Sequence, residues 1–398
     1  GGKMLNETIV RELSEKLKEP KWLLDRRINA FKKFAELEMP SFKYGIGIFV
    51  DVSGLKLEEI NPLGEAGKGF SIMGKDVKII GFKDAKEDYE ELIKRHFMDS
   101  MRYDEDKLSS LHGAFFGNGV LIVIPENKEI MEPIIINCNV KESRLDYILV
   151  IAEKNSKAVI IDSSNSDDKN DQVFRSEVVE VIIKENARLE YIHVQNLGKT
   201  VYNFCRRNGH VDKNGILYWV DCGIGSKFTQ AATLTNLNGI GSESKSLGIV
   251  FGDKEQCFDI KSSTIHNASK TTCNMLTKVV LNDQAKTVYR GLVKIKPLAV
   301  NCEGYQKDDT ILLSENARVD VVPNLEIENN DVRCTHGATI SQVDEDKLFY
   351  MMSRGLNTIS AKKLIVEGFF YPIIEKIENK SMQEDIIESI SERLGELE

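Results

Sequence analysis

The sequence has little of what marks fibrous, disordered or membrane chains. Eight prolines and 28 glycines among 398 residues are too few for a collagen-like or Pro/Gly-rich disordered protein. No run of about 18 uncharged apolar residues occurs, and the N-terminus lacks the apolar core of a secretory signal. With 41% apolar residues the chain can bury a large core. We therefore expect a cytoplasmic globular protein that does not enter a membrane.

Charge and cysteine content further limit the kinds of partner and enzyme chemistry that we expect. The net charge is −9, with acidic and basic residues mixed along the chain, so the positive surface typical of a nucleic-acid partner is not expected. Seven cysteines is an odd number without a secretion signal, which favours reduced thiols. The sequence has no P-loop, no HExxH, no GxSxG and no CxxC pair, so the common motif-borne enzyme chemistries are excluded.

Three segments differ in pattern. Residues 4–132 read as a helical and α/β cap, with helices between Glu7 and Met39 interrupted at Pro20 and ended by Pro40. Strands are predicted at 77–82 and 119–125, and a helix at 88–101. Residues 341–398 are helical again: 344–354 and 358–377, the latter kinked at Pro372, then a helix starting with a capping box at Ser381.

Residues 133–340 contain short β-type runs with little helical periodicity. The runs recur every 14 to 17 residues, and paired runs give a period near 30. So many short strands do not fit one flat sheet, which leaves a β-helix, a sandwich or a barrel open. The helical ends would cap the exposed coils of a β-helix.

Three cysteines repeat near this period. Cys273, Cys302 and Cys334 are 29 and 32 residues apart, so in a β-helix they would fall in one column on successive coils. Stacked thiolates select zinc, copper(I) or iron-sulfur centres, although a free cysteine is more often a small buried hydrophobe. Glu303 and His336 lie beside two of them as further ligand candidates.

The sequence resembles the SufB/SufD family of iron-sulfur cluster assembly scaffolds over nearly its whole length. The resemblance rests on residues 323–339, 347–350, 353–355, 289–295, 224–227 and 114–120. It implies a right-handed parallel β-helix core with helical ends, pairing of two β-helices, and a C-terminal helical region that binds the SufC-type ABC ATPase. Such a scaffold is not itself an enzyme, since the partner hydrolyses ATP.

Departures from the bacterial SufB pattern are specific. No cysteine stands near Ala317 or at His210, and Gly337 replaces the glutamate after the histidine. The chain therefore resembles compact archaeal-type members that work as homodimers. We hypothesise that Cys302 and Cys334, with Glu303, His336 and Cys273, hold a transient [4Fe–4S] cluster near the dimer interface for delivery to apo-proteins.

Two copies of the ATPase are expected on the C-terminal helices. The residues predicted to contact them are mostly aromatic: Phe349, Tyr350, Met351, Leu356, Phe369 and Phe370. About half of these are expected only to cap the β-helix.

Two alternatives remain open. The first is a SufD-like structural partner that holds no cluster by itself, which the departures at Ala317 and Gly337 favour. The second is a solenoid carbohydrate enzyme with clustered carboxylates, although no such site is recognisable.

Overall fold

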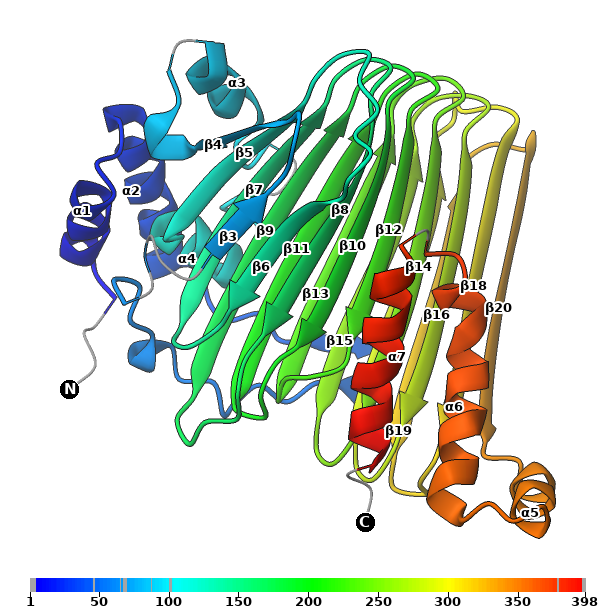
Figure 1. The fold of residues 1–398 in the computed structure, drawn as a ribbon. Coiled ribbons are helices and arrows are strands. Elements are labelled where there is room, and N and C mark those ends of the chain that lie inside the picture. Colours follow the sequence, from blue (N-terminus) through cyan, green and yellow to red (C-terminus); the bar gives the residue numbers. More distant parts are fainter. Residues whose placement is uncertain are drawn as a thin grey trace.

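The chain forms a parallel β-solenoid. The computed structural model describes residues 5–45, 47–64, 66, 70–86, 88–99, 102–377 and 379–395. Two nine-stranded sheets face each other, and from β5 on the chain alternates between them, so each of these strands pairs with the strand two places on (Figure 1). The predicted β-helix core with helices at both ends is confirmed, and the sandwich and barrel alternatives are wrong.

All strand pairs in the two sheets are parallel except the first in each. The first sheet contains, in spatial order, β20 (Val332–Gln342), β18 (Cys302–Leu312), β16 (Thr272–Leu281), β14 (Glu243–Gly252), β12 (Ile216–Gly223), β10 (Arg188–Asn196), β8 (Lys157–Asn165), β6 (Ile134–Asn139) and β3 (Phe70–Met73). The second contains β19 (Arg318–Ile327), β17 (Lys286–Ile295), β15 (Cys257–His266), β13 (Phe228–Leu237), β11 (Val201–Val211), β9 (Val173–Ile183), β7 (Arg144–Ala152), β5 (Asn118–Ile124) and β4 (Lys78–Gly81).

The coil length matches the predicted period. Paired residues are separated by between 26 positions, as for Tyr202 and Phe228, and 32 positions, as for Lys286 and Arg318. One corner repeats an asparagine with positive φ in four successive coils, and the side-chain amides bond to one another at 2.7 to 3.3 Å. These asparagines are Asn127, Asn155, Asn186 and Asn214. Asparagine tolerates the left-handed conformation, so each forms a tight corner.

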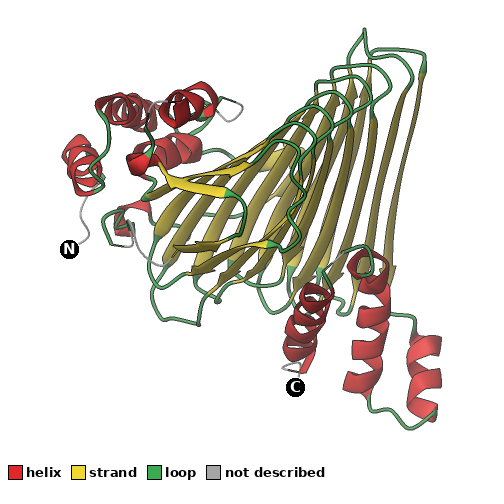
Figure 2. Cartoon of the chain, turned by 45° about the horizontal axis from the view of Figure 1, so that its top comes forward, coloured by secondary structure: helices red, strands yellow, loops and turns green. Residues whose placement is uncertain are grey.

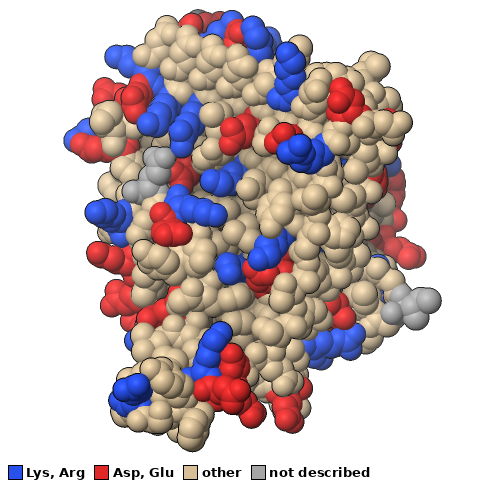
Figure 3. Space-filling view, turned by 90° about the vertical axis from the view of Figure 1, so that its right-hand side faces the viewer, with Lys and Arg blue, Asp and Glu red and all other residues tan. Residues whose placement is uncertain are grey.

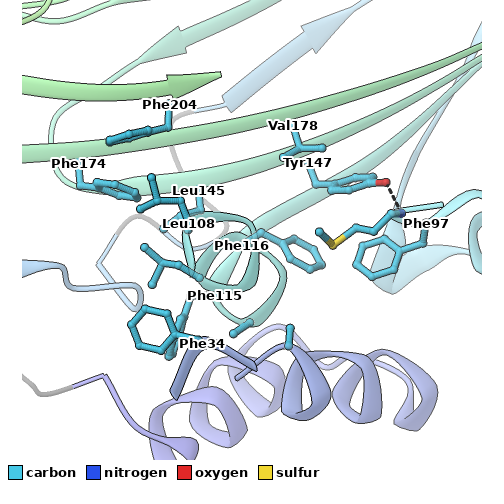
Figure 4. Close-up of a cluster of buried hydrophobic side chains, with 14 of the residues drawn as sticks. Phe34, Phe97, Leu108, Phe115, Phe116, Leu145, Tyr147, Phe174, Val178 and Phe204 are labelled. Atoms are coloured by element: carbon cyan, nitrogen blue, oxygen red, sulfur yellow. Dashed lines mark hydrogen bonds between the residues drawn. The ribbon is translucent and has the colours of Figure 1, made fainter. Parts of the chain in front are cut away.

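The helices of the N-terminal segment cover the first end of the solenoid, whereas Tyr44 and Gly47 reach Asp259 and Arg318 of the second sheet. The elements of this segment are α1 (Glu7–Lys16), α2 (Lys21–Glu36), β1 (Lys43–Gly45), β2 (Ile48–Phe49), η1 (Leu57–Glu59), η2 (Phe82–Asp84), α3 (Asp88–His96) and α4 (Lys107–Phe115). Figure 4 shows aromatic side chains of α2 and α4 packed against Tyr147 and Phe174 of the second sheet. The Tyr147 hydroxyl accepts a hydrogen bond from the Met98 amide at 2.8 Å. This packing buries the outer face of the first coils.

Two boundaries in this segment differ from the sequence prediction. Helix α3 ends at His96, and residues 100 and 101, which the sequence assigned to the same helix, lie outside the described residues. Strand β5 already pairs in parallel with β7, so the solenoid begins within the segment that the sequence assigned to the cap.

Two of the three C-terminal helices lie along the outer face of the first sheet, and the remaining one, residues 345–353, packs beside its neighbouring helix (Figure 2). The three helices are α5 (Glu345–Ser353), α6 (Thr358–Ile374) and α7 (Lys380–Gly395). Helix α6 includes Pro372 and ends two residues later. The predicted capping box at Ser381 is wrong, because Asn379 caps α7 by accepting a hydrogen bond from the Met382 amide at 2.9 Å. An asparagine side chain serves this role as well as serine does.

The last coil is an open end. Strands β19 and β20 are the edges of their sheets, and nearly all their residues are exposed or half-buried. Figure 3 faces this end of the molecule and shows positive and negative side chains interspersed among uncharged ones, without a large patch of one sign. No helix among the described residues is long and apolar enough to cross a membrane.

Candidate functional site

Three thiols meet inside the last coils. Residues of one face alternate along a strand, and the register places Cys273 of β16 and Cys334 of β20 on either side of Gly304 of β18. Cys302 lies two positions before Gly304, on the same inward face. Cys273 and Cys334 therefore fall in one column, as predicted. Cys302 does not, because it lies two residues before the position that pairs with them.

Gly304 lets two of the sulfurs pack closely against the backbone of β18. A Cβ atom placed on Gly304 would lie 3.0 Å from Cys334 Sγ and 3.6 Å from Cys273 Sγ. The third neighbour is Cγ1 of Val293, at 2.9 Å. A side chain here would therefore have to displace these neighbours, and only glycine fits without a shift.

Cys302 and Cys273 are joined by a buried hydrogen-bonded group. Cys302 Sγ lies 3.2 Å from Oγ1 of Thr271 and 3.4 Å from the carbonyl oxygen of Ala268. The same Thr271 oxygen is 2.7 Å from Nδ1 of His266, whose Nε2 is 3.2 Å from Cys273 Sγ. Sequence reasoning missed His266, because it is seven residues from Cys273 in sequence and comes from the opposite sheet.

Burial keeps the thiols of Cys273 and Cys334 protonated before metal binds. It raises the pKa of Cys273 to about 12, and it raises the pKa of the half-buried Cys334 as well. The thiolate is the metal ligand, so binding displaces these protons and gains affinity as the pH rises. Cys334 is the most accessible of the three, since the described part of the chain covers it only partly.

The other two predicted ligands are placed differently. Glu303 is exposed and opposes Thr272 and Arg333, so it points away from the interior that Cys302 faces. His336 is on the inward face of β20, opposite Gln306, but it is exposed at the open end. The fold thus brings Cys273, Cys302 and Cys334 together, places His336 at their margin and separates Glu303 from them.

A second group of ligand-type side chains lies in the middle of the solenoid. The ligand atoms of Glu177, His193 and Cys205, all buried, are within 4.8 Å of one another. Arg175 Nη1 donates to Cys205 Sγ at 3.2 Å, and Arg207 Nη2 is 3.7 Å from Glu177 Oε2. Two buried guanidinium groups beside these atoms disfavour a cation, so a buried ion-pair network explains them better.

The predicted partner residues divide into exposed and buried groups. Phe349 and Tyr350 on α5 are 75% and 58% exposed. Met351, Leu356 and Phe369 are half-buried, and the Lys278 ammonium lies 4.1 Å from the centre of the Phe369 ring. Phe370 is fully buried between α6 and the first sheet, where it attaches the helix to the solenoid.

Comparison with known proteins agrees with this architecture. Residues 135–369 match the family model described as "SUF system FeS cluster assembly, SufBD core domain". Proteins named iron-sulfur cluster assembly SufBD family protein, from Staphylococcus saprophyticus and from Staphylococcus aureus, are each 26% identical to the chain. Each match covers 94% of this chain and 90% of the relative. The chain therefore belongs to the SufBD family of iron-sulfur cluster assembly proteins.

Proposed function

We propose that the protein is a scaffold on which an iron-sulfur cluster is built and from which it is transferred to apo-proteins. The observation that carries this proposal is the set of three inward thiols, Cys273, Cys302 and Cys334, in the last coils beside the open end. Thiolates suit iron-sulfur clusters, and a site at the end of a solenoid is accessible without opening its centre. The cluster is the cargo of the scaffold.

The open end also supports a homodimer. Edge strands present unpaired N–H and C=O groups that can pair with another chain. Two copies meeting through β19 and β20 would form a symmetric interface and bring two sets of thiols toward each other. One cluster per dimer then agrees with a single polypeptide that supplies both halves of the site.

The C-terminal helices are the proposed contact for a SufC-type ABC ATPase, one copy on each protomer. The exposed rings of Phe349 and Tyr350 are suited to anchoring in a partner's groove. Movement of two bound ATPase subunits would then be transmitted through α6, which Phe370 fixes to the first sheet, to the dimer interface. In this proposal ATP hydrolysis belongs to the partner and shifts the scaffold between two states.

The test is anaerobic co-purification with the cognate ATPase, followed by iron and sulfide analysis and Mössbauer spectroscopy. We expect about four iron and four sulfide per dimer, as one [4Fe–4S] cluster gives. Cys302→Ser combined with Cys334→Ser should lose both, whereas Cys257→Ser should keep them, because Cys257 is on the outer face of β15. A complex that forms but never holds iron would favour the SufD-like structural partner instead.

The partner surface has a separate test. Phe349→Ala combined with Tyr350→Ala should abolish co-purification of the ATPase. Phe49→Ala, which removes a comparably exposed ring on β2, a strand outside the C-terminal helices, should not. Retention of the ATPase by the double variant would exclude α5 as the contact.

A further inference from the structure

A segment that follows α2 crosses the strands of the second sheet. We call it the strap, and it comprises residues 42–45 and 47–60. At one end its backbone exchanges two hydrogen bonds of 2.9 Å with the side-chain amide of Gln172, directly before β9. Toward the other end the carbonyl oxygen of Gly47 accepts from Arg318 of β19 at 3.3 Å. Because β9 and β19 are five strand spacings apart in the sheet, the strap spans about 24 Å across its strands.

The strap is held most firmly at a buried carboxylate. The Tyr44 hydroxyl donates to Asp259 of β15, whose side chain is fully buried. Arg290 of β17 donates to the same carboxylate at 2.7 Å, and its guanidinium carbon lies 3.7 Å from the centre of the Tyr44 ring. Gln230 of β13 donates to Asp259 at 2.9 Å. Three neighbouring strands and the strap thus meet at one charged group, where hydrogen bonds are stronger than those between neutral groups.

The contact of the strap with β19 is weaker. The Arg318 side chain is 57% exposed, and its guanidinium group also pairs with Asp320 on the same strand. Water competes for an exposed group of this kind, so the bond to Gly47 contributes less than the bonds at the buried Asp259. The strap therefore holds β13, β15 and β17 together but binds β19 only loosely.

This difference affects how the solenoid can open. Each coil of a solenoid contacts only its neighbours, so an opening that starts at a free end can pass from coil to coil. A segment that joins three strands makes them open together, at a higher free energy than one strand alone. Cys273 is in β16, which the chain forms between the held strands β15 and β17, whereas Cys334 is in β20, beyond all of them.

We propose that the strap confines opening at the free end to β19 and β20, and so retains the coil of Cys273 while cargo is released. This inference rests on the proposed scaffold function and adds a control of release to it. Detachment of the strap lets β15 to β18 open as well, and cargo is then lost without the action of the ATPase.

The test measures amide hydrogen exchange in the cluster-free full chain, so its result does not depend on the cluster. Tyr44→Ala removes the ring and the hydroxyl that bind the strap to Asp259 and Arg290, and exchange in β15 and β17 should accelerate by roughly 10- to 100-fold. Arg318→Gln should accelerate exchange only in β19. Phe49→Ala is the matched control, since its ring is 65% exposed on the same hairpin, and it should change neither region.

A milder variant keeps the test decisive if Tyr44→Ala does not fold. Tyr44→Phe retains the ring and removes only the hydroxyl, so it should give a smaller acceleration in the same strands. Unchanged exchange in β15 and β17 of the folded Tyr44 variants, or acceleration of equal size in β5 and β7, would overturn the role of the strap and leave the scaffold function standing.

The anaerobic complex with the ATPase gives the second readout. Without ATP, the Tyr44→Ala complex should lose iron to a chelator at least about 10-fold faster than wild type, and the Phe49→Ala complex should match wild type. Faster exchange without faster loss of iron would overturn the control of release. A wild-type complex without iron would overturn the scaffold function, and with it the control of release, while the exchange pattern would still decide whether the strap confines opening.

Discussion

Replacing Gly304 with alanine should block the cluster without removing any ligand. The added methyl group would lie 2.9 Å from Cγ1 of Val293 and 3.0 Å from Cys334 Sγ, both closer than ordinary contacts. Overpacking of this kind costs about 1–3 kcal/mol of folding free energy. We expect the lower part of that range, because Cys334 is on the edge strand and can move outward.

The effect on the cluster should be much larger than the effect on folding. The methyl group would push Cys334 and its neighbours out of their present positions, so iron and sulfide in the anaerobic complex should fall close to zero. Thermal unfolding of the cluster-free variant measures the folding cost separately. Gly223→Ala is the matched control, since its Cβ would be 3.6 Å or more from its neighbours in another buried part of the solenoid. Full iron and sulfide in Gly304→Ala, with stability close to wild type, would refute the placement of the cluster at the thiols beside Gly304.

Three further predictions concern stability. Phe370→Ala should lower the free energy of unfolding by about 3–5 kcal/mol in urea denaturation, whereas Phe349→Ala should change it by less than about 0.5 kcal/mol, since only Phe370 is buried. Arg175→Met should cost about 3–5 kcal/mol by leaving Glu177 without its buried partner, and adding Glu177→Gln should restore part of the loss. Burial raises the pKa of Asp308 to about 7, so the folded state holds this proton more tightly than the unfolded state, whose pKa is about 3.9. The contribution of Asp308 to the free energy of unfolding is complete below about pH 4 and is lost as the pH rises to about 7. Asp308→Asn should therefore flatten this part of the curve of unfolding free energy against pH. An unchanged slope in the variant would contradict the reasoning.

The architecture could be predicted from the sequence because coil length and strand alternation are local properties. Runs of β-type residues at half the coil period indicated stacked coils beside a sandwich or a barrel, and the spacing of three cysteines predicted that they fall in one column. A further repeat was also visible: Asn127, Asn155, Asn186 and Asn214 recur at the coil period, each following or preceding a lysine or glutamate. This repeat indicates a tight corner in each coil, and its spacing could have favoured a solenoid over a sandwich or a barrel from the sequence alone.

The surroundings of the thiols were harder to predict because they depend on contacts across the interior. The alternation of side chains along a strand already places Glu303 on the opposite face of its strand from Cys302. His266 could not be found in that way, since only the packing of the two sheets brings its ring to Cys273. Likewise, helical periodicity identified α6 as amphipathic but did not tell that Phe370 faces the solenoid while the rings of α5 face solvent.

The position of the thiols at the end of the solenoid has an energetic reason. A middle coil is supported by neighbours on both sides, whereas the last coil loses the contacts of one side, and its residues are correspondingly exposed. Regions with fewer buried contacts open at lower free energy than the core. In the proposed scaffold, cargo held by the thiols of β16, β18 and β20 would be released by a local movement of β20, which carries Cys334, while Cys273 stays fixed in the buried coil behind it. A cluster at the central Glu177 group would instead require the rupture of a buried ion-pair network, which is several times more costly.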